Sequence, residues 1–314
     1  MTTLAISGED FLIDGAPANA GRALDGIPLD GLLLNSRMIN GIFDDLNPDT
    51  RRQWAYPDTG RWDPDRNTDE FIAAMPQWRA DGLDAFTLGV QCGSPQGYSK
   101  RQPWDSGGYE PDGALRPAHF GRLRRILGEA DRLGFAVILS LFYQGQEMRL
   151  ADADAVRRAV RDTARFVLDA GWQNVALEIA NECNIPHDYT HSRLMRGENV
   201  HELIELAQSV RGDGRRLLAS ASFVDVSYFR DTVPDAVFVT TDDHFDFGRD
   251  YNHMKSALRA HVSWGYFDPG SVTTWPDPAP TLGDYRNGFQ AVPVNWGPSS
   301  ALKRAFFDTL RRAT

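Results

Sequence analysis

The residues Pro117–Tyr143 read PAHFGRLRRILGEADRLGFAVILSLFY, which is the pattern of a helix, a glycine and a strand in succession. Pro117 suits the first turn of a helix, and the apolar residues after it recur at helical spacing. Gly134 can adopt the left-handed conformation that closes a helix. The run that follows Gly134 is almost entirely apolar, as in a strand buried on both faces. The unit therefore predicts a parallel strand with a crossover helix packed against it.

The same order recurs along the chain. Similar strand-like runs occupy Gly31–Ile39, Leu83–Gln91, Asn174–Asn181, Leu217–Phe223, Ala236–Thr241 and His261–Phe267. Helices are expected near Thr68–Ala80 (with Pro76 as a weak point), from Asp152 or Asp154 to Ala170, and near Glu198–Val210, Asp250–Ala260 and Ser299–Arg312. No Gly-rich dinucleotide fingerprint follows the first strand and no P-loop motif occurs, which disfavours an open nucleotide-binding sheet. A closed barrel is favoured.

We therefore expect an α/β protein with a (β/α)8 TIM-type barrel, formed as a single domain by residues 1–314. Seven runs are convincing strands, whereas the barrel needs eight. The stretch Phe223–Asp242 is too short for an ordinary strand–helix–strand unit, so one unit is expected to be degenerate or missing. Near the N-terminus, Ile13-Asp14-Gly15 predicts a hairpin turn below the barrel.

Composition excludes several classes of protein. The chain has 42% hydrophobic and 24% charged residues, which is ordinary for a globular protein. Its net charge of −10 disfavours a nucleic-acid partner, because phosphate binding needs a basic surface. No apolar run approaches a membrane span, and the first residues do not read as a signal peptide. Two cysteines exclude a disulfide framework, and we expect reduced thiols and a cytoplasmic location.

The long segments that follow strands are expected to carry the function, because active sites of barrels lie at the carboxyl ends of the strands. These segments are Asn40–Asn67, Cys92–Arg116 and Glu182–Asn199. They contain Trp54, Tyr56, Trp62, Tyr98, Trp104 and Tyr109. Exposed aromatic rings around a polar cleft suit sugar binding. The competing interpretation is that the rings pack the loops onto the barrel.

The pair Asn181-Glu182 ends the fourth apolar run, at the expected catalytic edge. A partly desolvated carboxyl there would have a raised pKa and could act as a general acid. Asn181 could hold a substrate hydroxyl or orient Glu182. The alternative is a solvated glutamate at the start of a loop.

A second acidic group, Asp242-Asp243-His244, follows another predicted strand. Adjacent residues of a strand face opposite sides, so only one of the two aspartates would face the barrel axis. An Asp-rich turn that caps the next helix is the competing interpretation, with about equal weight.

Several stretches together resemble one family. They are Gly31–Arg37 (GLLLNSR), Gly41–Asn47 (GIFDDLN), Trp54–Gly60 (WAYPDTG), Gly93–Tyr98 (GSPQGY), Asn181-Glu182-Cys183, Asp242–Phe245 (DDHF) and Ser263–Asp268 (SWGYFD). The chain resembles the clan of retaining glycoside hydrolases with (β/α)8 barrels that includes cellulases and β-galactosidases, and more closely a branch of uncharacterised cellulase-like proteins. The resemblance implies a carbohydrate or glycoside substrate and Glu182 as the acid/base. No cofactor is expected.

The resemblance also implies a nucleophilic glutamate at the end of the seventh strand, and here the chain departs from the pattern. Relatives carry Asn-Glu before Asp-Asp-His-Phe, whereas this chain has Thr240 and Thr241. A threonine hydroxyl lacks the charge to stabilise an oxocarbenium-like transition state. Asp243 or Asp242 is then the candidate second carboxylate, as a base for water. A catalytically impaired sugar-binding protein is the alternative.

Further candidates for substrate contacts lie at or near strand ends, and they are Arg37, Asn35, Gln91, Tyr143 and Trp264. His244, beside the aspartates, and Trp104, in a long loop, are further candidates. Structural packing is an equal or stronger interpretation for each of them. His187 and His191 offer two imidazoles at helical spacing, which keeps a metal-dependent isomerase or hydrolase as a third class, but the segment reads as a loop and no metal is expected.

Overall fold

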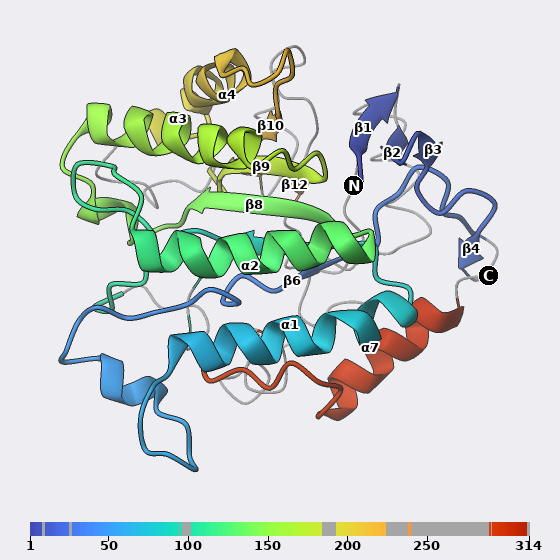
Figure 1. The fold of residues 1–314 in the computed structure, drawn as a ribbon, viewed down its shortest axis with the longest axis horizontal. Coiled ribbons are helices and arrows are strands. Elements are labelled where there is room, and N and C mark those ends of the chain that lie inside the picture. The colour runs from blue at the N-terminus through green and yellow to red at the C-terminus, as the bar shows by residue number, and fades with distance from the viewer. Residues whose placement is uncertain are drawn as a thin grey trace.

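The computed structural model describes residues 1–7, 10–24, 27–93, 95, 102–183, 193–223, 238–239, 289 and 291–312. Its centre is a five-stranded parallel sheet in the order β10-β9-β8-β7-β6 (Figure 1). The strands are β6 (Asn35–Arg37), β7 (Ala85–Gly89), β8 (Ala136–Phe142), β9 (Val175–Ala180) and β10 (Leu218–Ser220). Each falls inside an apolar run of the sequence, as predicted. Strands β6 to β9 are buried along their whole length, as expected for a parallel sheet covered on both faces.

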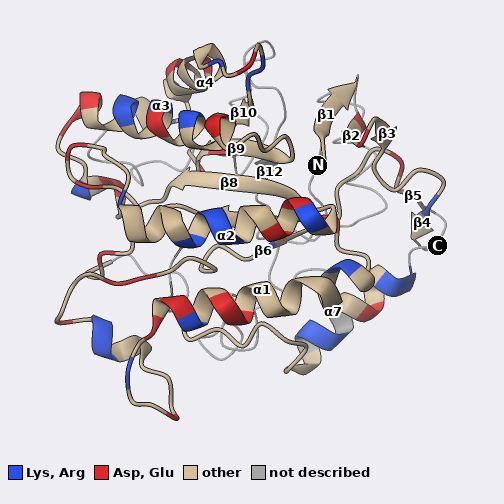
Figure 2. Cartoon of the chain, in the orientation of Figure 1, with Lys and Arg blue, Asp and Glu red and all other residues tan. Residues whose placement is uncertain are grey.

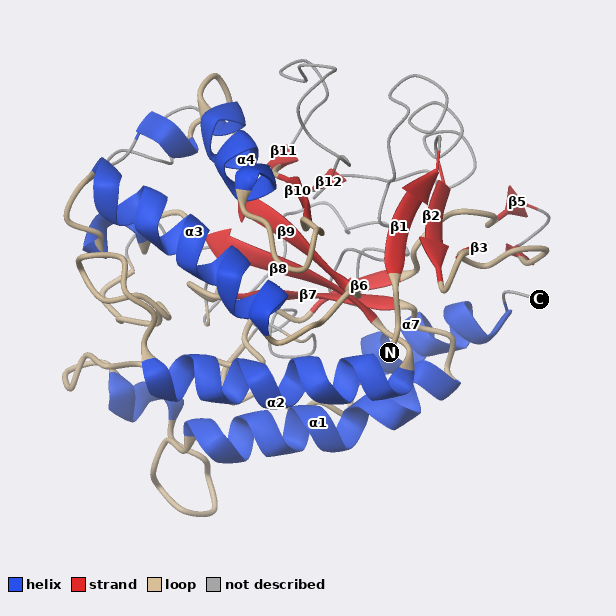
Figure 3. Cartoon of the chain, turned by 45° about the horizontal axis from the view of Figure 1, so that its top comes forward, coloured by secondary structure: helices blue, strands red, loops and turns tan. Residues whose placement is uncertain are grey.

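Helices follow the strands and cover one face of the sheet, as Figure 3 shows. They are α1 (Pro64–Ala80), α2 (Pro117–Leu133), α3 (Ala153–Asp169), α4 (Val200–Ser209) and α7 (Ala301–Arg312). Both basic and acidic segments occur along α1, α2 and α3 (Figure 2). Among the described helices, none has the length and apolarity needed to span a lipid bilayer.

The helix boundaries follow from caps that the sequence contains. Gly134 closes α2 in the left-handed conformation, with φ of 78°. Asp152 accepts hydrogen bonds from the amides of Asp154 and Ala155 at the start of α3. The expected start of the first helix at Thr68 is wrong. The helix begins at Pro64, because Asp63 caps it, and it continues through Pro76.

Short strands complete the described part. The N-terminal hairpin contains β1 (Leu4–Ser7), β2 (Asp10–Ile13) and β3 (Ala16–Pro17), and the predicted turn lies between β2 and β3. The pair β4 (Ala23–Leu24) and β5 (Ile27–Pro28) is antiparallel, whereas β11 (Ser222–Phe223) and β12 (Phe238–Val239) are parallel. Three short 3-10 helices are η1 (Arg51–Trp54), η2 (Glu147–Arg149) and η3 (Arg193–Met195).

The two faces of the sheet bury different clusters. Alternate strand residues such as Phe86 and Leu139 join the helices in one large core that extends from Leu24 to Leu310. The residues between them face the other side. Ala85, Ala136, Ile138 and Ala176 pack there against Leu4, Phe11 and Ala18 of the N-terminal hairpin. The hairpin therefore covers the amino-terminal end of this inner face of the sheet. Further along the strands, Ser140, Glu178 and Ser220 lie on the same face.

Candidate active site

Side chains from three neighbouring strands meet at the carboxyl edge of the sheet, as the sequence predicts. Arg37 ends β6, Gln91 follows β7 and Tyr143 follows β8. Together with Ser140 and Cys92 they line a narrow cavity that has no room for a water molecule. Ligand pockets usually enclose about 300–1,000 Å³, so this cavity does not by itself hold a sugar.

Hydrogen bonds hold the walls of this cavity in place. Gln91 Oε1 accepts the backbone N–H of Tyr143 at 3.0 Å, and Gln91 Nε2 donates to the carbonyl of Gln146 at 3.3 Å. The guanidinium of Arg37 lies 5.9 Å from the centre of the Tyr143 ring, within cation–π range. Gln91 therefore joins the ends of two strands, and Arg37 brings a positive charge to the cavity.

Glu182 lies just beyond the end of β9 and is 8% exposed. Its backbone has φ of 50°, in the left-handed region that residues other than glycine seldom adopt. Ser222 holds this turn on both sides. The N–H of Glu182 donates to Ser222 Oγ at 2.8 Å, and the N–H of Cys183 donates to the Ser222 carbonyl at 3.0 Å. These hydrogen bonds therefore hold the backbone of Glu182 in one conformation.

Asn181 is held by the loop that follows β8. Its N–H donates to the carbonyl of Phe142 at 3.1 Å. Its side-chain amide donates to Gln144 Oε1 at 3.2 Å, and Gln144 Nε2 donates back to the carbonyl of Asn181 at 2.8 Å. Asn181 thus fixes the loop beside Glu182.

Asn35 lies away from the cavity that Arg37 lines. It is fully buried, and its amide donates to the hydroxyl of Thr87 at 3.2 Å, inside the sheet. Asn35 is the first residue of β6 and lies two positions before Arg37, so it sits deeper along the inner face. This placement separates Asn35 from the other predicted contacts of the sugar.

The expectation of exposed loop aromatics is wrong for the five that the structure describes. Trp54, Tyr56, Trp62, Trp104 and Tyr109 are each at most 8% exposed. The Trp104 ring packs edge-on against Trp54, with 5.7 Å between the ring centres, so it offers no open platform to a sugar. The loops bury their own aromatic core, as the competing interpretation held.

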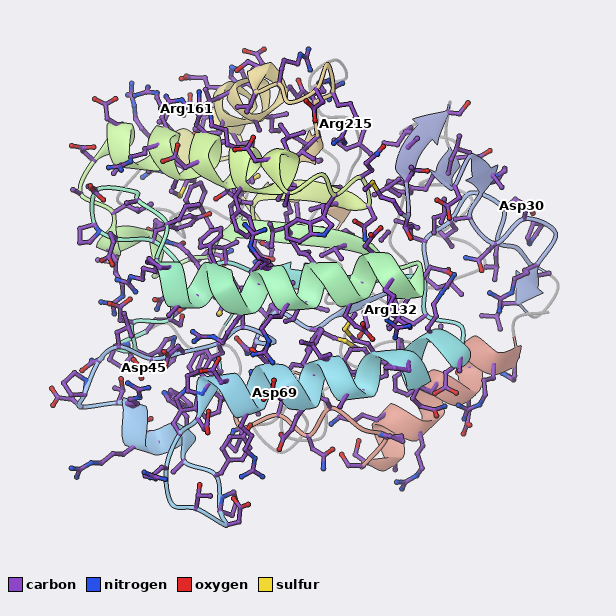
Figure 4. All side chains as sticks on the ribbon, viewed as in Figure 1. Asp30, Asp45, Asp69, Arg132, Arg161 and Arg215 are labelled. Atoms are coloured by element: carbon purple, nitrogen blue, oxygen red, sulfur yellow. The ribbon has the colours of Figure 1, made fainter. Side chains whose placement is uncertain are left out.

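A buried carboxylate organises this aromatic core. Asp45, labelled in Figure 4 in the loop that follows β6, accepts hydrogen bonds from Trp54 Nε1 at 2.7 Å and from Thr50 Oγ1 at 2.6 Å. Its other oxygen accepts the N–H of Asp105 at 2.9 Å. These bonds tie the loop after β6 to the loop after β7, which explains why the tryptophans turn inward.

Glu178 is a site residue that the sequence reasoning missed. It lies in the middle of β9 on the inner face and is fully buried. Burial raises its pKa, while the Arg37 charge and the nearby hydroxyls of Ser222 and Ser140 lower it. The sequence indicates this residue only by a single charged position inside the apolar run VALEIA.

Both cysteines are free thiols at the ends of strands. Cys92 and Cys183 are 1% and 2% exposed. Burial raises the pKa of each thiol well above its usual range. Neither thiol has the lowered pKa that an activated nucleophile needs, so the structure supports the reading of two inert thiols.

The remaining predicted site residues lie outside the described part of the chain. They are Asp242, Asp243, His244, Trp264, His187, His191, Thr240, Thr241 and Tyr98. The expected helix near Asp250–Ala260, the strand His261–Phe267 and the shortened unit before Asp242 fall there as well. Within the ranges that the structure does describe, no three His, Cys, Asp or Glu side chains are grouped to hold a metal ion.

A second hollow, of about 630 Å³, lies between α1 and residues 293–297. Its charged groups already satisfy one another, since Arg66 pairs with Glu70 at 2.8 Å and Tyr56 donates to Glu70 at 3.2 Å. The Trp296 ring in its wall is 2% exposed. The carboxyl edge of the sheet, where Glu182 follows β9, is therefore the better candidate for chemistry, although Glu182 is not among the residues that line the strand-end cavity.

Comparison with known proteins identifies the fold. No family model and no curated protein matches the sequence. Among solved structures, a putative glycoside hydrolase from Bacteroides vulgatus is similar over 98% of this chain, with a TM-score of 0.57 and 15% identity. This chain spans 60% of the length of that protein.

Two further structures match over most of both chains. A β-1,4-D-mannanase from Cryptopygus antarcticus aligns with 99% of this chain and 94% of its own, with a TM-score of 0.55 and 12% identity. A glycoside hydrolase family 5 enzyme from Prevotella bryantii, in complex with a xyloglucan tetradecasaccharide, aligns with 88% and 94%, with a TM-score of 0.51 and 11% identity. The predicted fold class, an α/β barrel of the TIM type, is confirmed. The scaffold is one that glycoside hydrolases use.

Proposed function

We propose that this protein is a glycoside hydrolase in which Glu182 is the general acid/base. The observation that carries the proposal is the position of Glu182, two residues beyond the end of a central parallel strand in a barrel-type sheet. In barrels of this type catalytic groups come from strand ends. Glu182 is nine-tenths buried, which suits a carboxyl that must hold a proton near neutral pH.

The proposed chemistry begins with proton transfer from Glu182 to the glycosidic oxygen as the bond to the sugar breaks. Arg37, Gln91 and Tyr143, which lie together at the carboxyl edge of the sheet, are the proposed contacts for sugar hydroxyls. Asn181 is proposed to hold the loop beside Glu182 in place rather than to contact the sugar directly. His244 and Trp264 remain proposed contacts from the sequence alone.

Asp243 or Asp242 is the proposed second carboxylate. A carboxyl separation of about 5–5.5 Å produces retention, and about 6.5–9.5 Å leaves room for a water and produces inversion. Because Thr241 stands where the resemblance implies the nucleophile, we favour activation of water by an aspartate. The reaction would then proceed with inversion.

The test is hydrolysis of a panel of aryl glycosides and of mannan, glucan and xyloglucan by the wild type and by Glu182→Gln. We expect the substitution to lower the rate by about 10²–10⁴-fold, the usual contribution of a general acid. Asp84→Asn is the matched control, because Asp84 is a buried carboxyl at the opposite end of the same sheet. Equal rates in the wild type and in Glu182→Gln would remove Glu182 from the mechanism.

A second candidate function is sugar binding without catalysis on a hydrolase scaffold. Thr240 and Thr241 favour it, because they stand where the resemblance implies Asn-Glu. Calorimetry with the same sugars separates the two proposals. Binding without product after prolonged incubation would support the sugar-binding protein, whereas turnover would exclude it.

A further inference from the structure

One peptide group of the turn after β9 is held at both its oxygen and its nitrogen. This group joins Asn181 to Glu182, and its carbonyl oxygen accepts a hydrogen bond from Gln144 Nε2 at 2.8 Å. Its N–H donates to Ser222 Oγ at 2.8 Å. The two partners come from different elements, since Gln144 follows β8 and Ser222 begins β11. A planar peptide group that is bonded on both sides in this way resists rotation.

The orientation of this peptide group sets the backbone conformation of Glu182. When a planar peptide group rotates, ψ of the residue before it and φ of the residue after it change together. Glu182 has φ of 50°, in the left-handed region that disfavours residues other than glycine. Rotation of the peptide group would return Glu182 to the negative φ that an L-residue prefers. The hydrogen bonds to Gln144 and Ser222 oppose that rotation.

Gln144 is in turn held by the loop that follows β7. Gln102 Nε2 donates to the backbone carbonyl of Gln144 at 2.6 Å, and Gln102 Oε1 accepts from Gln146 Nε2 at 3.2 Å. The Gln102 side chain lies against Gly145, where an added Cβ would be 3.3 Å from Gln102 Cδ. Gln102 therefore packs directly on the turn that carries Gln144.

Gln146 joins the same two loops at a second place. Its side chain is fully buried, and its Oε1 accepts the N–H of Ser106 at 3.2 Å and Arg149 Nε at 3.3 Å. Its Nε2 donates to the carbonyl of Trp104 at 3.0 Å as well as to Gln102. An amide has two N–H donors and two acceptor lone pairs, so the Gln146 side chain is fully used. The loops after β7 and β8 therefore form one hydrogen-bonded unit that reaches the turn after β9.

We propose that Gln144 is a positioning residue for Glu182 and acts through the peptide group between Asn181 and Glu182. Ser222 holds the N–H of this group and Gln144 holds its oxygen, so together they fix the direction in which the Glu182 side chain leaves the backbone. The bond from Asn181 Nδ2 to Gln144 Oε1, at 3.2 Å, keeps the Gln144 nitrogen turned toward the carbonyl. The meaning of this arrangement for catalysis rests on the proposed function, but the arrangement itself does not.

The test is NMR spectroscopy of the intact protein, read at the Glu182 amide. A positive φ brings the amide proton of a residue close to its own Hα, which makes the cross-peak between these two protons strong. In Gln144→Met we expect this cross-peak of Glu182 to weaken, and the Glu182 amide to exchange about fivefold faster relative to amides of β8. Gln144→Glu should have the same effect, because it keeps the acceptor for Asn181 Nδ2 and loses the donor to the Asn181 carbonyl.

Gln102→Met should produce a smaller change of the same kind, since it removes one bond that holds Gln144. Gln77→Met is the matched control and should change neither measurement, because the Gln77 amide bonds to Asp81 at the end of α1. An unchanged cross-peak and exchange rate in Gln144→Met, or wild-type behaviour of Gln144→Glu, would overturn the proposal. Neither measurement needs turnover, so an inactive protein would refute the proposed hydrolase and not this inference.

Discussion

The backbone N–H of Glu182 donates to Ser222 Oγ at 2.8 Å, across the gap between β9 and β11. Four positions separate Glu178 from Glu182 along the chain, and the sheet register places Glu178 beside Ser140 and Ser220 on the inner face. The hydrogen bond from Glu182 therefore ties the turn after β9 to β11.

Phe11→Ala should destabilise the protein by about 3–5 kcal/mol, because a buried aromatic ring is lost from a packed cluster. Phe11 is 1% exposed and packs with Ala136 and Ile138 on the inner face of the sheet. Urea unfolding followed by far-UV circular dichroism measures the change. The exposed residue Met148 provides the control, since Met148→Ala should change stability by less than about 0.5 kcal/mol. Equal stability of Phe11→Ala and the wild type would show that the hairpin does not close the sheet.

Trp104→Phe should leave sugar affinity unchanged and cost little stability. The Trp104 ring is buried, and its Nε1 has no hydrogen-bond partner among the described residues. Arg37→Met should weaken sugar binding, because Arg37 lies at the end of β6, on the edge of the sheet where the sugar is proposed to bind. Calorimetric titration of both variants measures the contrast. A large loss of affinity in Trp104→Phe alone would restore the tryptophan as a contact of the sugar.

The two thiols should resist alkylation in the folded protein. Burial of Cys92 and Cys183 raises the pKa of both, so almost no thiolate forms at pH 8. Mass spectrometry after iodoacetamide treatment should show an unmodified native protein and two modifications in urea, one for each cysteine of the sequence. Rapid native modification of Cys183 would contradict its described burial.

Glu178→Gln should stabilise the protein increasingly as pH rises. The pKa of Glu178 is raised in the folded state, so the folded wild type holds this proton more tightly than the unfolded chain does. The wild type therefore loses stability as pH rises above the ordinary value of 4.5, until the folded group has ionised. Urea unfolding at several pH values from 4 to 8 should show a growing advantage of the variant.

Glu129→Gln serves as the control of opposite sign. Its hydrogen bond to Arg132 lowers the Glu129 pKa, so the stability that the charged form contributes is lost as pH falls. A difference between wild type and Glu178→Gln that is constant with pH would show that Glu178 has an ordinary pKa.

The order of helices and strands could be predicted because burial on both faces leaves continuous apolar runs. Pro117–Tyr143 contains the proline that starts a helix, the glycine that ends it and the strand that follows. The structure has α2 and β8 at these positions. The first helix begins earlier than the apolar spacing predicts, because Asp63 caps it and Pro64 forms its first turn.

The side-chain environment of the site was harder to predict. The direction of loop aromatics depends on long-range bonds such as Asp45 to Trp54, which no local pattern shows. Glu178 and Glu182 lie in one short stretch, but only the sheet register shows that Glu178 faces inward with Ser140. The left-handed turn at Glu182 depends on Ser222, which is distant in sequence.

The most direct test of the central claim is how the effect of Glu182→Gln depends on the leaving group. A general acid matters most when the departing oxygen is basic, and little when it leaves readily as an anion. Rates should therefore fall by about 10²–10⁴-fold for alkyl glycosides and by far less for dinitrophenyl glycosides. An equal loss for both leaving groups, or no loss for either, would contradict the role of Glu182 as the acid.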